Sequence, residues 1–248
     1  MAQSHTVKAY DAELNELRSI ISQMGGLAEA QLAAAIDTLI KRDSESALRV
    51  VAADKAIDAL DEDAEKLAVQ IIALRAPMAD DLREIISALK ISSLLERIGD
   101  YAKNIAKRST VLSQLDSVEP LAIVPQMARI AAGMVKDVLD AFVARDVEKA
   151  IRVRDRDRAV DDLYNSLFRE LLTYMMENSR HITTSAHLLF IAKNIERIGD
   201  HATNIAEIVY FSATGESIEV ARPKQDETAY TIVNPPAKTD DGDNNTDQ

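Results

Sequence analysis

The chain repeats itself, and this duplication constrains its fold more than any other feature of its 248 residues. Residues 96–106 read ERIGDYAKNIA and residues 196–206 read ERIGDHATNIA, with nine of eleven positions identical at a spacing of 100. Upstream the match continues at a spacing of 103, so that Arg42-Asp43 corresponds to Arg145-Asp146. The change in spacing places a three-residue length difference near residues 75–82, which a loop tolerates better than a helix. The repeat predicts two similar halves.

Apolar residues recur every three or four positions in three segments of each copy, as in Ile91, Leu95, Ile98, Ala102 and Ile105. Glycine (7) and proline (6) are scarce, which also favours helices over a sheet. The predicted helices are 8–41, 45–74 and 79–113 in the first copy, and 121–144, 147–178 and 182–211 in the second.

These helices predict an all-α protein made of two tandem three-helix bundles related by internal duplication. The heptad-like apolar stripes also fit an extended coiled coil, but two short breaks in each copy favour antiparallel neighbours. Asp43 and Asp146 are expected to cap the second helix of each copy. The predicted units are a first bundle at 1–118, a second bundle at 119–212, and a disordered acidic tail at 213–248.

Composition excludes several classes of protein. There is no cysteine, so disulfides and thiolate metal sites are absent. The net charge of −12 argues against non-specific nucleic-acid binding. No signal peptide is visible at the first residues, and no apolar run approaches the ~20 residues that cross a bilayer. We therefore expect a cytoplasmic protein.

Acidic residues repeat with helical spacing in both copies. Acids at i and i+4 share a helix face and repel one another by a few tenths of a kcal/mol, so their recurrence indicates a neutralising cation. In heptad terms they lie off the apolar stripe, which predicts side chains on the outer surface of each bundle. The candidate ligands are Asp54, Asp58, Glu62, Glu96, Asp100 and Asn104 in the first copy, and Asp157, Asp161, Glu196, Asp200 and Asn204 in the second.

Oxygen ligands alone favour hard divalent or trivalent ions such as Mg²⁺, Ca²⁺, Mn²⁺ or Fe³⁺, with Zn²⁺ as a further candidate. The ordinary alternative is a solvated acidic face paired with nearby bases such as Arg97 and Lys103, each pair contributing roughly 0–1 kcal/mol. Gly99 and Gly199 are expected where a neighbouring helix approaches closely. The sequence does not choose the metal.

With these residues in view, the chain resembles the PhoU family of phosphate-transport regulatory proteins. The resemblance rests on the two ERIGD-containing segments, on RAPMADDLREI at 75–85, and on the paired acids at 54–58 and 157–161, and it covers about residues 8–212. It implies multinuclear metal sites in which Glu96 and Asp100 combine with Asp54 and Asp58, and the corresponding acids combine in the second copy. Asn165 stands where the first copy has Glu62, so the two sites are expected to differ in charge.

The resemblance also implies a negative regulator of the phosphate-starvation response. Its expected partners are the ATPase subunit of the phosphate ABC transporter and a sensor histidine kinase, with membrane contact only through them, and a homodimer is expected. Two alternatives remain: a metal-free structural bundle, and a di-metal carboxylate enzyme of the ferritin-like type. The enzyme would need inward-facing Glu and ExxH motifs, and no histidine here has Glu three residues before it. We therefore expect no enzymatic activity.

Overall fold

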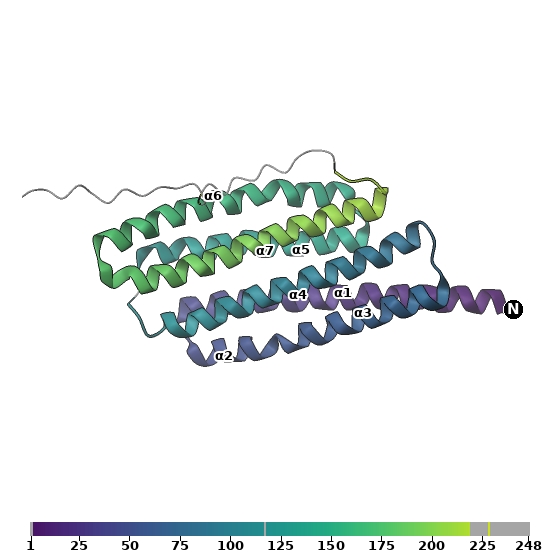
Figure 1. Ribbon diagram of the computed structural model, residues 1–248, viewed down its shortest axis with the longest axis horizontal. Helices are drawn as coiled ribbons and strands as arrows, with labels where there is room; N and C mark the ends of the chain where they lie inside the picture. Colours follow the sequence, from purple (N-terminus) through teal and green to yellow (C-terminus); the bar gives the residue numbers. More distant parts are fainter. Residues whose placement is uncertain (1, 117, 219–227, 229–248) are drawn as a thin grey trace, which may run out of the picture.

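The computed structural model describes residues 2–116, 118–218 and 228, and these form seven α-helices, two short 3-10 helices and no strand. Figure 1 shows the helices lying side by side, with the first half of the chain along one edge and the second half along the other. In the first half the helices are α1 (Ala2–Lys41), α2 (Ser44–Ala53), α3 (Lys55–Arg75) and α4 (Asp80–Leu112). In the second half they are η1 (Glu119–Ile123), α5 (Val124–Ala144), α6 (Val147–Glu177), η2 (Ser179–His181) and α7 (Ile182–Thr214).

The predicted pair of three-helix bundles is confirmed, with one departure in the first half. The helix expected over 45–74 is divided at Asp54 into α2 and α3. The backbone of Asp54 keeps helical dihedral angles, and its carbonyl accepts from the N–H groups of Ile57 and Asp58 at 2.9 and 3.2 Å. The two pieces therefore act together as the counterpart of the unbroken α6.

The duplicated capping residues behave as the sequence predicted. Asp43 accepts the backbone N–H of Ser46 at 3.0 Å, and Asp146 accepts that of Lys149 at 2.9 Å. The residues before them, Arg42 and Arg145, both have positive φ angles of 57° and 52°. The extra three residues of the first half lie at the α3–α4 loop, where Ala76 ends α3 in the left-handed conformation.

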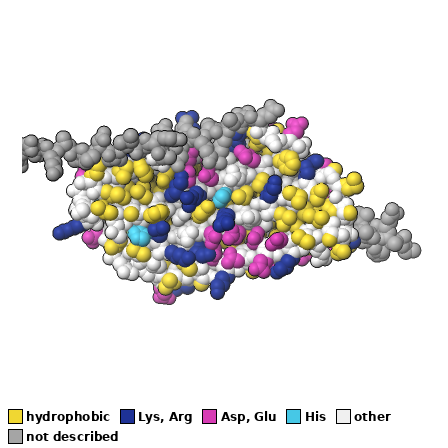
Figure 2. Space-filling view, in the orientation of Figure 1, with side chains coloured by type: hydrophobic (Ala, Val, Ile, Leu, Met, Phe, Trp, Pro, Cys, Tyr) yellow, Lys and Arg dark blue, Asp and Glu magenta, His cyan; other side chains and the backbone are white. Residues whose placement is uncertain are grey.

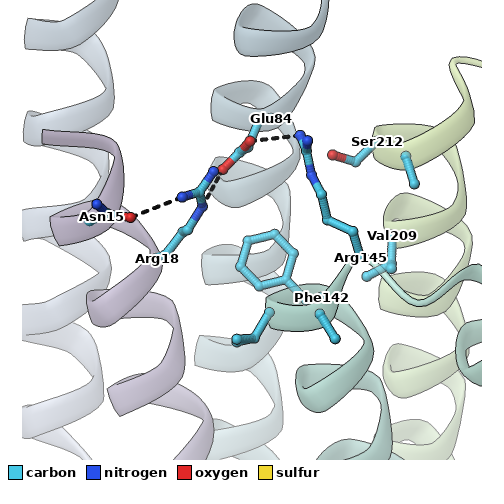
Figure 3. Close-up of a pocket in the computed structure, with 10 residues that line it drawn as sticks. Asn15, Arg18, Glu84, Phe142, Arg145, Val209 and Ser212 are labelled. Carbon is cyan, nitrogen blue, oxygen red and sulfur yellow. Dashed lines mark hydrogen bonds and ion pairs between the residues drawn. The ribbon is translucent and has the colours of Figure 1, made fainter. Parts of the chain in front are cut away.

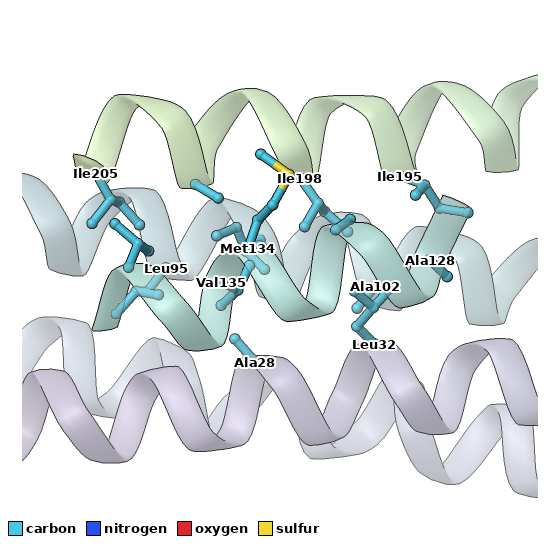
Figure 4. Packing of buried hydrophobic residues seen from close by; sticks show 14 of the residues in the cluster. Ala28, Leu32, Leu95, Ala102, Ala128, Met134, Val135, Ile195, Ile198 and Ile205 are labelled. Carbon is cyan, nitrogen blue, oxygen red and sulfur yellow. The ribbon is translucent and has the colours of Figure 1, made fainter. Parts of the chain in front are cut away.

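The two bundles share one apolar core. The inner helices of the first bundle, α1 and α4, contact α5 and α7 of the second, and fully buried side chains from all four meet in a single cluster (Figure 4). Leu95 and Ile195, at corresponding positions of the repeat, are both 0 % exposed. Burying a side chain of this size stabilises a fold by roughly 1.5–3 kcal/mol, so the shared core ties the halves together.

Glycine allows the close helix contacts that the sequence predicted. A Cβ atom on Gly99 would lie 2.8 Å from Ile57 Cδ1, and one on Gly199 would lie 3.2 Å from Asp157 Oδ1. Between them, Tyr101 stacks on His201 with ring centroids 5.4 Å apart. These two rings occupy matching positions of the repeat, so α4 and α7 meet at the point that relates one half to the other.

Within the described residues, no helix is both long and apolar enough to span a membrane. At its C-terminus α7 ends at Thr214 and is capped by Gly215, whose φ of 78° suits glycine. Most of the acidic tail expected at 213–248 lies outside the described residues.

Candidate cation-binding site

The acidic residues of the first half gather around a lysine. Asp54, at the junction of α2 and α3, is 2 % exposed, and Lys103 of α4 places its Nζ 2.5 Å from Asp54 Oδ2. The same Nζ donates to Asp100 Oδ1 at 2.8 Å. The other oxygen of Asp54 accepts from Gln31 Nε2 of α1 at 3.1 Å. The two carboxylates raise the pKa of Lys103, because both accept hydrogen bonds from its ammonium group.

The other predicted ligands of this half lie at the edge of that group. Burial, and then the charge of Asp54, raises the pKa of Asp58. Burial, and then the charge of Asp100, raises the pKa of Glu96. Asn104 is half-buried on the same helix. Glu62 does not join them, because its side chain is 71 % exposed and pairs with Lys66 at 3.2 Å.

In the second half the acids turn inwards. Asp157 and Asp161 of α6 are each 4 % exposed, and Glu196 of α7 is 5 % exposed. Asp200 and Asn204 are half-buried. The prediction that these side chains stand on the outer surface is therefore wrong for Asp54, Asp157, Asp161 and Glu196. A heptad assigns a single core face, whereas the second and third helices of each bundle pack flank to flank, and Gly99 and Gly199 let them approach closely.

Glu196 is the most perturbed acid of the second half. Burial raises its pKa to about 7; Lys193, whose Nζ donates to Oε1 at 2.9 Å, acts in the opposite direction, and Asp200 and Asp161 add to the increase. Its other oxygen, Oε2, is buried without a hydrogen-bond partner. About two turns further along α7, the buried hydroxyl of Thr203 likewise has no hydrogen-bond partner. Buried oxygens of this kind are what a cation would satisfy.

As the side chains stand, no three acidic or histidine residues in the described part of the chain converge closely enough to hold a metal ion. In the first half, Lys103 stands between the acids of two helices, and a metal ion does not fit beside it. In the second half, the buried Glu196 Oε2 has no hydrogen-bond partner, which leaves one carboxylate oxygen available to a cation.

A second polar group joins the two bundles and was missed by the sequence analysis. Glu84 of α4 accepts from Arg18 Nε of α1 at 2.5 Å and from Arg145 Nη2, at the end of α5, at 2.7 Å. Figure 3 shows these residues lining a cavity of about 380 Å³ with Phe142 and Ser212. The matching positions of Arg42 and Arg145 in the repeat could have drawn attention to these arginines, but nothing in the sequence indicated that Arg145 pairs with Glu84.

Figure 2 shows that acidic side chains gather near the middle of one face, over α3 and α4, with lysine and arginine side chains beside them. The candidate site therefore lies at the flank between the second and third helices of each bundle, part surface and part interior.

Comparisons with known proteins agree with this arrangement. The PhoU domain model matches the chain twice, at residues 21–109 and 124–209. The phosphate-specific transport system accessory protein PhoU homolog of Zymomonas mobilis is 56 % identical over 214 residues, covering 86 % of this chain and 90 % of that protein. The homolog of Caulobacter vibrioides is 51 % identical over 223 residues, which are 90 % of this chain and 97 % of that one.

Solved structures give the same result. The crystal structure of PhoU from Pseudomonas aeruginosa superposes with a TM-score of 0.81 and 39 % identity, covering 84 % of this chain and 100 % of that one. That of the phosphate transport system regulatory protein PhoU from Streptococcus pneumoniae superposes with a TM-score of 0.79 and 30 % identity, covering 85 % and 100 %.

Proposed function

The chain belongs to the PhoU family, and on that premise we propose that it is a negative regulator of phosphate uptake and of phosphate-starvation signalling. It acts as an adaptor between the ATPase subunit of the phosphate ABC transporter and a sensor histidine kinase. The observation that carries the proposal is the match of both halves to the PhoU domain, together with 56 % identity to an accessory protein of phosphate transport.

The family consists of accessory and regulatory proteins, and the chain is not an enzyme, as the sequence predicted. The form of the molecule suits an adaptor, because its long helices present an extended surface and its two bundles are held together by one core. Homodimerisation, and membrane contact only through the partners, remain predictions.

The adaptor role is tested by capture of the transporter ATPase and the sensor kinase on the full chain, at high and at low phosphate. We expect both partners to be retained, and deletion of the gene to switch on a phosphate-starvation reporter at high phosphate. A silent reporter after deletion would contradict the regulatory role, and capture of neither partner would contradict the adaptor role.

We also propose that the acidic cluster of the second half binds hard cations. Asp157, Asp161, Glu196 and Asp200 offer only oxygen ligands, which suit Mg²⁺, Mn²⁺ or Fe³⁺. A bound cation would satisfy the buried Glu196 Oε2 and counter both the burial and the neighbouring charges of Asp200 and Asp161 that raise the pKa of this carboxyl. In this role the protein's own residues hold the ion between α6 and α7.

The cation proposal is tested by Mn²⁺ titration of the purified chain, followed by electron paramagnetic resonance of the free ion. Asp161→Asn and Glu196→Gln should weaken binding about tenfold or more, since each removes a charged ligand. Asp162→Asn is the matched control, because Asp162 is the next residue on α6 but is 60 % exposed and faces Arg158. If all three variants weaken Mn²⁺ binding equally, the loss reflects the overall negative charge of the surface, and the proposed site is contradicted.

A further inference from the structure

The cavity beside Glu84 is lined by residues from four helices. Figure 3 shows side chains of α1, α4, α5 and α7 around it. Its volume of about 380 Å³ falls within the range of small-molecule sites, which is roughly 300–1,000 Å³. Because α1 and α4 belong to the first bundle and α5 and α7 to the second, a molecule bound here would contact both halves of the chain.

Two arginines give the cavity wall a positive charge. Glu84 accepts from Arg18 Nε at 2.5 Å and from Arg145 Nη2 at 2.7 Å, so one carboxylate is shared by two guanidinium groups. These three are the charged side chains among the described residues that line the cavity, and their sum is one positive charge. Asp11 and Asp81 raise the pKa of Arg18 less than Glu84 does, and neither lines the cavity. The cavity wall is therefore positive in a chain whose net charge is −12.

Both guanidinium groups keep N–H donors for a second acceptor. Within the described residues, the Arg18 side chain donates from Nε to Glu84 and from Nη1 to Asn15, and the Arg145 side chain donates from Nη2 to Glu84. A guanidinium has five N–H donors in a planar fork that matches carboxylate and phosphate oxygens. The side chains of Arg18 and Arg145 are 40 % and 51 % exposed, so a small molecule in the cavity can reach them.

The remainder of the wall is mostly apolar. It comes from the end of α5 and the end of α7, with one hydroxyl, and consists of Phe142, Val143, Ala144, Val209, Ser212 and Ala213. Val143 is 60 % exposed, so the apolar part of a ligand would cover it. A bare oxyanion would fill only a small part of this space. The geometry therefore favours an oxyanion that carries a small apolar group.

We propose that this cavity binds a small organic anion, whose phosphate or carboxylate group contacts Arg18 and Arg145 and whose apolar part lies against Phe142 and Val143. Glu84 is a positioning residue, because it takes one edge of each guanidinium group and holds both beside the cavity. The site is distinct from the acidic cluster between α6 and α7. A ligand in it joins the two bundles through contacts with both.

Calorimetric titration of the full chain at constant ionic strength tests the proposal with four probes. Phenyl phosphate and benzoate carry both an oxyanion and an apolar ring, inorganic phosphate carries the oxyanion alone, and phenol carries the ring alone. We expect at least one of the first two to bind about tenfold more tightly than inorganic phosphate, because the ring buries apolar surface. Phenol should bind at least about tenfold more weakly than that probe, because it has no charge for the arginines. The stronger of phenyl phosphate and benzoate identifies the oxyanion.

Variants of the cavity wall locate the binding. Arg145→Gln and Arg18→Gln should each weaken the stronger probe about tenfold or more, since each removes a charged donor. Arg42→Gln is the matched control, because Arg42 has the same left-handed backbone in the first repeat but lies outside the cavity wall, and it should change binding by less than about twofold. Val143→Ser should weaken the stronger probe about threefold and leave inorganic phosphate unchanged.

Arg145→Lys keeps the charge but loses the planar fork, and it serves the same comparison if Arg145→Gln does not fold. Circular dichroism of each variant checks that the helices are retained. Weakening by Arg145→Lys, with the helices intact, would support recognition by the fork.

Three results would overturn the inference. Equal binding of phenol and the stronger probe would show an apolar cavity without anion recognition. Equal weakening by Arg42→Gln and Arg145→Gln would show attraction to the overall surface charge. Failure of all four probes to bind at millimolar concentration would show that the cavity holds no such ligand. The regulatory function and the cation site are measured separately, by the reporter and by Mn²⁺ titration, and do not depend on this result.

Discussion

The two halves of the molecule share a backbone plan but differ in the partners of their charged side chains. Arg42 and Arg145 end the first helix of each half with the same left-handed backbone. Arg42 donates to the carbonyls of Ser113 and Leu115, whereas Arg145 donates to Glu84 of the other bundle. The position that matches Glu84 is Thr184. The two halves therefore share their helix caps, their close helix contacts and their apolar core, whereas their ion pairs differ.

This difference follows from how much each feature constrains the fold. A glycine at a helix crossing or a cap at a helix start has few substitutes, because the backbone leaves room for little else. An ion pair with an exposed partner contributes little to stability and is replaced at small cost. Conversely, a substitution that changes an ion pair can give one half a new role without changing its shape.

The largest expected effect tests whether the halves share one core. Leu95→Ala and Ile195→Ala should each lower the free energy of unfolding by about 2–5 kcal/mol, since both residues are fully buried at matching positions. Because the core is continuous, both variants should unfold in one transition by calorimetry and by circular dichroism. Two separate transitions, each affected by one variant, would show that the bundles are independent.

A smaller effect tests the contact between the halves. Glu84→Gln keeps the shape of the side chain but removes the charge that accepts from Arg18 and Arg145. Glu84 is 5 % exposed, while both arginines are partly exposed and can turn to solvent, so we expect a loss of about 1–3 kcal/mol in urea unfolding. Arg83→Gln, on the same turn of α4 and paired with Asp80, is the control and should cost less than about 1 kcal/mol.

Much of the fold could be predicted because it depends on periodicity and repetition. The helix boundaries at Lys41, Ala144 and Glu177 lie within one residue of those expected, since left-handed residues and caps mark them. The extra residues near 75–82 were placed correctly in a loop, because a helix interior would have rotated out of register. The contact between bundles was not predictable, because a repeat defines each half but not how the halves pack.

The sequence named the acidic residues of the candidate site, and it did not predict how buried several of them are. Asp58 and Glu62 are exposed as expected, while Asp157, Asp161 and Glu196 lie between α6 and α7. A heptad pattern records one apolar face, and a polar residue on the flank looks the same whether it faces water or a neighbouring helix. Lys103 illustrates the same limit. The sequence suggested an ordinary surface ion pair, whereas in the structure Lys103 contacts both Asp54 and Asp100 and so connects two helices.

The capping residues provide a comparison in which the halves should agree. Asp43→Ala and Asp146→Ala each remove a side chain that accepts a backbone N–H at the start of α2 or α6. Each should lower the free energy of unfolding by about 1 kcal/mol. Glu45→Ala, in the first turn of α2 and without a capping bond, is the control and should cost less. If the two substitutions lower the free energy of unfolding by clearly different amounts, the two caps contribute differently to stability despite their matching geometry.

The smallest effect concerns the residue that replaces Lys103 in the second half. Thr203 buries a hydroxyl that has no hydrogen-bond partner in the described structure. Thr203→Val keeps its shape and removes that unsatisfied group, so the metal-free protein should be unchanged or more stable by up to about 1 kcal/mol. If the hydroxyl instead helps to hold a cation, the same variant should lose part of the stabilisation that Mn²⁺ gives. Chemical unfolding with and without Mn²⁺ separates the two roles, and a loss of stability in metal-free buffer would mean that the hydroxyl is already satisfied within the fold.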